Sequence, residues 1–98
     1  MPAVMVRYTL KPGHAERNEA LVRAVYRELH DTQPSGFRYA TFKLDDGLTF
    51  IHVAAHEGES PLRELKAFAE FQAAIRERCD EEPIVTQAEE IGSYPRPA

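Results

Sequence analysis

The segment that decides the fold covers residues 36–57, GFRYATFKLDDGLTFIHVAAHE. Two runs rich in aromatic and β-branched residues flank the dipeptide Asp46-Gly47. A tight hairpin turn needs positive φ angles, which glycine adopts without strain, so Asp-Gly between such runs predicts a β-hairpin. If Asp46 and Gly47 form a two-residue turn, the pairing follows, and Thr41 should face His52.

This register divides the hairpin into two faces of different chemistry, because successive side chains of a strand point to opposite sides. We expect helices to cover the face that is almost entirely apolar, which contains Ala40, Phe42, Leu44, Ile51 and Val53. The other face suits a cavity or an interface, since it mixes rings, hydroxyls and imidazoles: Phe37, Tyr39, Thr41, Phe50, His52 and His56.

Periodicity places the remaining elements in order along the chain. Alternating apolar residues predict a strand over 3–11, and an apolar stripe at helical spacing predicts a helix over 14–30. Ser followed by Pro at 60–61 predicts the start of a second helix, whose stripe runs from Phe68 to Cys79, with or without a break. The acidic run 80–83 should end that helix, and residues 84–91 should form the last strand.

The resulting order β-α-β-β-α-β predicts an α+β fold, the ferredoxin-like split βαβ, in a single domain over residues 1–98. Right-handed crossovers put the first and third strands in the centre of a four-stranded antiparallel sheet. Both helices then cover one face and leave the other face open, with apolar side chains that need a cover. We expect a second copy of the chain to provide it, sheet against sheet, as a symmetric homodimer.

Composition excludes several classes of partner. The chain of 98 residues is 43% hydrophobic and 29% charged, with a net charge of -4 and no cluster of Lys and Arg, which argues against nucleic acid as a partner. No apolar run approaches the roughly 20 residues that span a bilayer, and no secretory leader is visible. The single cysteine, Cys79, cannot form an internal disulfide, so we expect a cytoplasmic protein.

With these elements in place, the chain resembles the dimeric α/β-barrel superfamily and, within it, the antibiotic biosynthesis monooxygenase (ABM) domain. The resemblance covers nearly the whole chain, in the segments MVRYTLKPGHAERNEALV (5–22), FKLDDGLTFIHV (42–53), FAEFQAAIRERCDEEP (68–83) and VTQAEEIGSY (85–94). It implies a dimeric barrel and, among the activities found on this fold, cofactor-independent oxygenation of quinol or polyketide-type substrates. The haem-degrading branch relies on a Trp, which this chain lacks.

Two residues are candidates for catalysis. His52 lies in the middle of a central strand, and imidazole titrates near neutral pH, so His52 is able to take a proton from a phenol or quinol-type substrate. The alternative is an interface histidine bonded to Thr41. Arg7, expected on the same face, is able to hold an enolate or carboxylate oxygen through charge-assisted hydrogen bonds. Its alternative is an ion pair with Glu89.

A second group of residues is expected to bind substrate. Tyr39 and Thr41 offer hydroxyl groups, although both are also ordinary strand residues. Four phenylalanines could wall a pocket for a flat ring or simply fill the core, namely Phe37, Phe50, Phe68 and Phe71. No metal site and no cofactor are expected, because the chain has no Cys cluster or helical His pair, and His52 and His56 are about 13 Å apart along a strand.

The sequence therefore supports two hypotheses of different classes. The first is a cofactor-independent monooxygenase for a small aromatic, quinol or polyketide-type substrate, with His52 as base and Arg7 as oxyanion holder. The second is a non-catalytic dimeric module that binds a small ligand or serves as an accessory subunit. An isomerase or lyase on the same barrel is a third and weaker reading.

Overall fold

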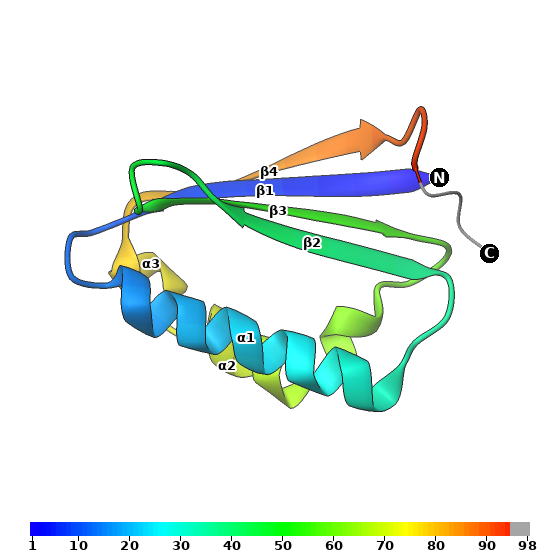
Figure 1. Cartoon of the computed structure of the whole chain (residues 1–98), viewed down its shortest axis with the longest axis horizontal. Coiled ribbons are helices and arrows are strands. Elements are labelled where there is room, and N and C mark those ends of the chain that lie inside the picture. Colours follow the sequence, from blue (N-terminus) through cyan, green and yellow to red (C-terminus); the bar gives the residue numbers. More distant parts are fainter. Residues whose placement is uncertain (95–98) are drawn as a thin grey trace.

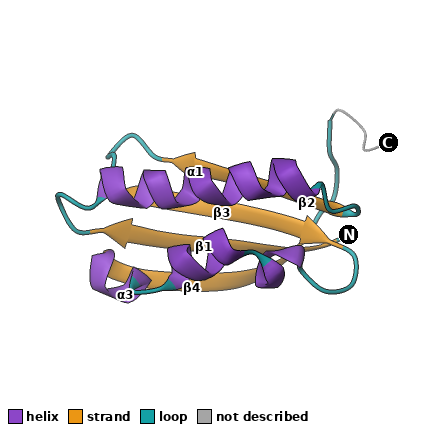
Figure 2. Ribbon diagram, turned by 90° about the horizontal axis from the view of Figure 1, so that it is seen from below, coloured by secondary structure: helices purple, strands orange, loops and turns teal. Residues whose placement is uncertain are grey.

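The computed structural model describes residues 1–94 of the chain. Its elements are, in order, β1 (Pro2–Leu10), α1 (Ala15–Thr32), β2 (Phe37–Lys43), β3 (Thr49–His56), the short 3₁₀ helix η1 (Pro61–Glu64), α2 (Lys66–Gln72), α3 (Ile75–Arg78) and β4 (Cys79–Glu89). The strands form one antiparallel sheet in the order β2-β3-β1-β4. All helices lie on one face of it (Figures 1 and 2). The ferredoxin-like fold class and its central first and third strands are therefore confirmed.

The hairpin has the predicted register but a different turn. Thr41 pairs with His52, as expected. The backbone N–H of Gly47 donates to the Leu44 carbonyl oxygen at 2.9 Å, so the β-turn begins at Leu44 and the loop is longer than two residues. The Asp46 carboxylate stabilises this longer loop, because it accepts hydrogen bonds from the backbone N–H groups of Leu48 and Thr49 at 2.9 and 2.8 Å.

The two faces of the hairpin are exchanged relative to the prediction. The face with His52 lies under the helices, and the more apolar face is open, where Phe42 is 55% exposed. The reason lies in β1, whose alternate apolar residues Val6 and Tyr8 point toward the helices. Because Val6 pairs with His52 and Tyr8 with Phe50, the register of β1 carries the mixed face of the hairpin into the core.

The second helical region is broken into short pieces. Ser60 caps the first, η1, as predicted, and its hydroxyl accepts from the backbone N–H of Leu62. The predicted stripe from Phe68 to Cys79 is interrupted, because α2 ends at Gln72 and Ala74 adopts a left-handed conformation with φ 60°. Cys79 is therefore not helical, and β4 begins there, five residues before the predicted last strand. The strand extends back to Cys79 because this stretch pairs with the end of β1. Its acidic side chains can remain in water, since β4 is an edge strand.

Helix α1 buries the predicted stripe and adds a polar residue to it. Leu21, Val22 and Val25 are buried as expected, and so is Asn18 in the first turn. Glu28 of α1 also caps α2, since its carboxylate accepts from the backbone N–H groups of Lys66 and Ala67 at 3.3 and 2.9 Å. No helix in the described part of the chain is long and apolar enough to cross a membrane.

Candidate functional site

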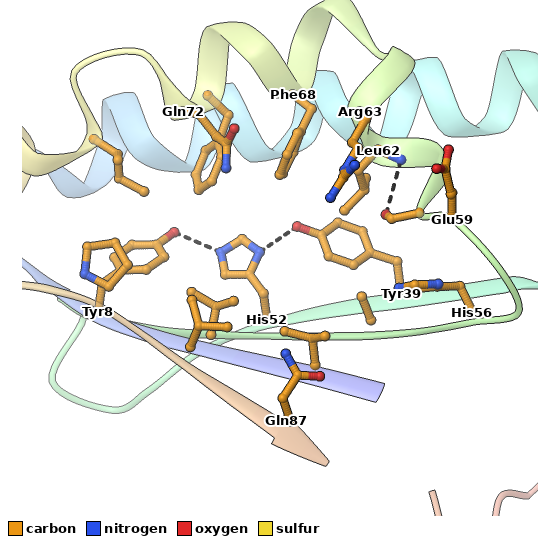
Figure 3. Close-up of a pocket in the computed structure, with 18 of the residues that line it drawn as sticks. Tyr8, Tyr39, His52, His56, Glu59, Leu62, Arg63, Phe68, Gln72 and Gln87 are labelled. Carbon is orange, nitrogen blue, oxygen red and sulfur yellow. Dashed lines mark hydrogen bonds between the residues drawn. The ribbon is translucent and has the colours of Figure 1, made fainter. Parts of the chain in front are cut away.

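A cavity of about 600 Å³ lies between the helix-facing side of the sheet and the roof formed by η1, α2 and α3 (Figure 3). Strands β1, β2, β3 and β4 all contribute to its floor. Most of its lining is apolar, including Val4, Val6, Leu62, Phe68, Phe71, Ile75 and Val85. Its polar and charged members are Tyr8, Tyr39, His52, His56, Glu59, Ser60, Arg63, Gln72 and Gln87. This composition is typical of a small-molecule site, where a few polar groups orient a ligand among apolar walls.

Strand register brings the polar groups of the floor together. His52 on β3 pairs with Thr41 on one side and with Val6 on the other, so their side chains share one face. Tyr39 and Tyr8 are two residues away from these partners on β2 and β1, which keeps them on that same face. Figure 3 shows the two phenol hydroxyls pointing at opposite sides of the His52 ring.

Both ring nitrogens of His52 are hydrogen bonded. The Tyr8 hydroxyl lies 2.8 Å from Nε2, and the Tyr39 hydroxyl lies 2.6 Å from Nδ1. The Thr41 hydroxyl lies 3.2 Å from the same Nδ1 and 2.8 Å from the hydroxyl of Tyr26 on α1. His52 is only 5% exposed, so these partners replace the water that the ring loses on folding.

The network extends from Tyr8 to a buried cation. The Asn18 amide Nδ2 donates to the Tyr8 hydroxyl oxygen at 2.9 Å. Arg78 donates from Nε and Nη2 to the Asn18 carbonyl Oδ1 at 3.3 Å, and its Nη2 also donates to the backbone carbonyl of Phe71 at 2.7 Å. Arg78 is 7% exposed, and the ion pairs found among residues 1–94 do not include it. Its charge is therefore satisfied by neutral acceptors.

Burial determines the protonation states of His52, Tyr8 and Tyr39. Loss of hydration lowers the pKa of His52 to about 4, so the imidazole is neutral near pH 7. The same loss raises the pKa of the Tyr8 and Tyr39 hydroxyls above the ordinary value for tyrosine. The site thus contains a neutral imidazole between two protonated phenols.

The structure brings some of the predicted site residues together and separates others. His52, Tyr39, Phe68 and Phe71 line the cavity. Thr41 contacts His52 but lies behind it, where it lines a separate depression beside α1 together with Phe50. Phe37 packs against the core and stacks on Tyr39, with ring centroids 5.8 Å apart.

Arg7 does not share the face of His52, so that prediction is wrong. Arg7 pairs with Ile51 of β3 and is exposed on the open side of the sheet. Its alternative partner, Glu89, pairs with Pro2 at the other end of β1. The alternation of β1 correctly predicts Arg7 on the open side of the sheet, but the prediction also puts His52 there, whereas His52 faces the helices.

Three residues of the site were not anticipated. Tyr8 belongs to the apolar alternation of the first strand, which gives no sign that its hydroxyl contacts His52. Asn18 and Arg78 are 60 positions apart and meet under the sheet. One signal was present, since Asn18 continues the apolar stripe of α1 three residues before Leu21, and an amide on a buried stripe needs a polar partner. Nothing local marks Arg78, because it lies within a charged run.

Within the described residues, no group of three or more His, Cys, Asp or Glu side chains is arranged to hold a metal ion. Cys79 is buried, and burial raises the pKa of its thiol, which favours the unreactive protonated form.

Comparison with known proteins shows the fold. No family model and no curated protein matches the sequence. Among solved structures, a suspected antibiotic biosynthesis monooxygenase from Nitrosomonas europaea superposes with a TM-score of 0.78 at 13% identity, over 94% of this chain and all of its own. A mutant of SnoaB, a cofactor-independent oxygenase from Streptomyces nogalater, gives 0.65 at 15% identity over 97% of both chains. A conserved protein from Methanosarcina mazei gives 0.71 at 15% identity over 91% of both.

Proposed function

We propose that this chain, which has the fold of antibiotic biosynthesis monooxygenase domains, binds a small aromatic, quinol or polyketide-type compound in its cavity and oxygenates it without a cofactor. The observation that supports this most strongly is the cavity itself. Its wall contains Phe68 and Phe71, which suit a flat ring, and its floor presents the hydroxyl of Tyr39 beside His52.

The chemistry required of such a site is modest. An anthrone-type substrate, which has an acidic CH₂ group, loses a proton to water and becomes an electron-rich anion, which transfers one electron to O₂. The two radicals combine at carbon as a peroxide, and loss of water leaves a carbonyl, so a CH₂ group and O₂ become C=O and H₂O. The protein has to bind the flat ring and stabilise the developing oxyanion, which preorganised hydrogen-bond donors do well.

We assign the contact with the substrate oxygen to Tyr39. A base role for His52 would require Nε2 to release the Tyr8 hydroxyl, which lies 2.8 Å from it. His52 is therefore proposed to act through Tyr39, whose hydroxyl lies 2.6 Å from Nδ1. Arg7, on the opposite face of the sheet, has no part in this cavity.

Oxygen consumption with a panel of hydroquinones and anthrones tests the proposal. Tyr39→Phe should lower the rate about tenfold or more, which corresponds to the loss of one hydrogen bond to a charged oxygen. Tyr94→Phe is the matched control, because Tyr94 is 99% exposed. Uptake no faster than autoxidation across the panel would exclude the oxygenase.

One observation favours the second candidate, a module that binds a similar ligand without turnover. Both ring nitrogens of His52 are engaged, so the floor of the cavity presents no free base. A thermal-shift screen with quinones and phenols separates the two candidates. Stabilisation by a ligand that is recovered unchanged in air supports the module, since binding to the folded state alone raises the melting temperature.

The open face of the sheet is proposed as a homodimer interface. Its exposed apolar residues are Met5 at 37%, Phe42 at 55% and Ile84 at 62%. Such side chains lie across β1, β2 and β4, and a second copy in the symmetric arrangement would cover the same patch on both protomers. A cytoplasmic location stays a prediction.

A further inference from the structure

The hydrogen bonds around His52 have a direction that starts at Arg78. A guanidinium can only donate, so the Asn18 atom that faces Arg78 must be its carbonyl oxygen. The amide group of Asn18 then faces Tyr8 and donates to the hydroxyl oxygen at 2.9 Å. This leaves the hydroxyl hydrogen of Tyr8 to be donated to Nε2 of His52 at 2.8 Å.

The direction continues through the imidazole. Because Nε2 accepts from Tyr8 and the ring is neutral, its hydrogen must be on Nδ1. Nδ1 then donates to the hydroxyl oxygen of Tyr39 at 2.6 Å. The hydrogen of Tyr39 remains for an acceptor in the cavity or for the Thr41 hydroxyl, which the Tyr26 hydroxyl also contacts.

We infer that Arg78 and Asn18 are positioning residues that fix His52 in its Nδ1–H form and thereby make Tyr39 a hydrogen-bond donor toward the cavity. The ligand that fits such a floor presents an acceptor oxygen there, as a phenolate, enolate or carbonyl does, rather than a hydroxyl that must donate. The inference thus specifies the protonation state of the ligand, and it rests on the proposed function because it takes the cavity to be the ligand site. Arg63 and Glu59 also line the cavity, and the variant tested below leaves both unchanged, so a change in its ligand preference reports on Tyr39.

One isosteric substitution should reverse the direction. In Asn18→Asp, both carboxylate oxygens accept, one from Arg78 and the other from the Tyr8 hydroxyl. Tyr8 then accepts from Nε2–H of His52, and Nδ1 becomes an acceptor for Tyr39. The new carboxylate stays ionised because it lies against the buried Arg78, which has no carboxylate partner among the ion pairs of residues 1–94.

The ¹⁵N resonances of the His52 ring report the tautomer directly. At about pH 8 the wild-type protein should show a protonated Nδ1 and an unprotonated Nε2, and Asn18→Asp should show the opposite. Gln33→Glu is the matched control, since it makes the same amide-to-carboxylate change at an exposed position and should leave the tautomer as in the wild type. A wild-type ring protonated on Nε2 overturns the inference, and this measurement needs no variant to fold.

The probe for the ligand is 4-nitrophenol, whose two protonation states have different absorption spectra. Wild-type protein should bind the phenolate about tenfold more tightly than the phenol, and so lower the pKa of the bound probe by about one unit. In Asn18→Asp that preference should disappear or invert, while binding of 4-nitroanisole, which has no ionisable proton, should be equal in both proteins. An unchanged preference in a variant with an exchanged tautomer overturns the inference. The tautomer and probe results can hold even if no substrate consumes oxygen, so failure of the oxygenase proposal is seen separately.

Discussion

His52 shows how a single residue can be buried without a charged partner. Its ring is 5% exposed and is bonded on both nitrogens, by Tyr8 and by Tyr39. A neutral imidazole meets those bonds fully, whereas an imidazolium would have to displace the donated hydrogen of Tyr8 and would lose its hydration. The environment therefore favours the neutral form, in agreement with a pKa of about 4.

Acid should consequently destabilise the fold through His52. As the pH falls, the unfolded chain takes up this proton near the ordinary value of 6.5, while the folded protein resists until about 4. The contribution of neutral His52 to the free energy of unfolding is therefore fully present above pH 6.5 and is lost as the pH falls from there toward about 4. Between about pH 7 and about pH 5 the loss should be about 2 kcal/mol.

Urea unfolding at a series of pH values measures this slope. In His52→Gln, which keeps a donor and an acceptor, the free energy of unfolding should change less over the same interval. His30→Gln, in the exposed last turn of α1, controls for the loss of one histidine and should keep the wild-type decline. Equal slopes in the wild type and in His52→Gln would contradict the assignment.

At the scale of elements, the roof of the cavity is built from short helices that depend on their neighbours. Helices η1, α2 and α3 have four, seven and four residues, too few to be stable alone. Leu65, the N-cap residue just before α2, makes no side-chain capping hydrogen bond, and Glu28 of α1 supplies one instead. Ala74 adopts a left-handed conformation with φ 60°, which separates α2 from α3.

Loss of the borrowed cap should loosen α2. Glu28→Ala should lower the free energy of unfolding by about 1 kcal/mol, and Glu28→Gln by less, since the amide oxygen still accepts one hydrogen bond. Thermal denaturation by circular dichroism measures both. Asp31→Ala, one turn further along α1 at an exposed position, serves as control. A loss in the control as large as in Glu28→Ala would remove the cap from the explanation.

The left-handed residue offers a stabilising substitution. An alanine at φ 60° bears a steric cost that glycine avoids, so Ala74→Gly should raise the free energy of unfolding by about 0.5 to 1 kcal/mol. Ala73→Gly is the matched control, because Ala73 has φ -61° and ψ 125° and should gain nothing. Chemical denaturation of both variants decides, and equal effects at the two positions would show that strain at Ala74 is absent.

At the scale of the whole molecule, the sheet has one covered and one open face. A row of paired residues runs across the open face in the strand order, Phe42, Ile51, Arg7 and Ile84. The proposed dimer would bury this row and place Arg7 in the interface rather than in the cavity. The ligand cavity, on the opposite side of the sheet, would then be complete in each protomer.

A charge on the open face should dissociate the dimer. Ile84→Lys should shift sedimentation from dimer to monomer at micromolar concentration, because the symmetric interface would bury two unpaired ammonium groups. Val85→Lys is the control, since Val85 is 61% exposed but points to the cavity side of the same strand. A wild-type protein that sediments as a monomer would end the dimer proposal.

The sequence alone was sufficient for the pattern of elements, the pairing of Thr41 with His52 and the strand order, because periodicity, turn residues and crossover handedness are local or nearly local rules. It also singled out His52, Tyr39, Phe68 and Phe71. Only the tertiary structure decided which face of the hairpin is covered, because the choice is made by register with β1 and not by which face of the hairpin is more apolar. The meeting of Arg78, Asn18 and Tyr8 likewise depends on segments that are distant in sequence, since hydrogen-bond partners are brought together by packing and not by spacing along the chain.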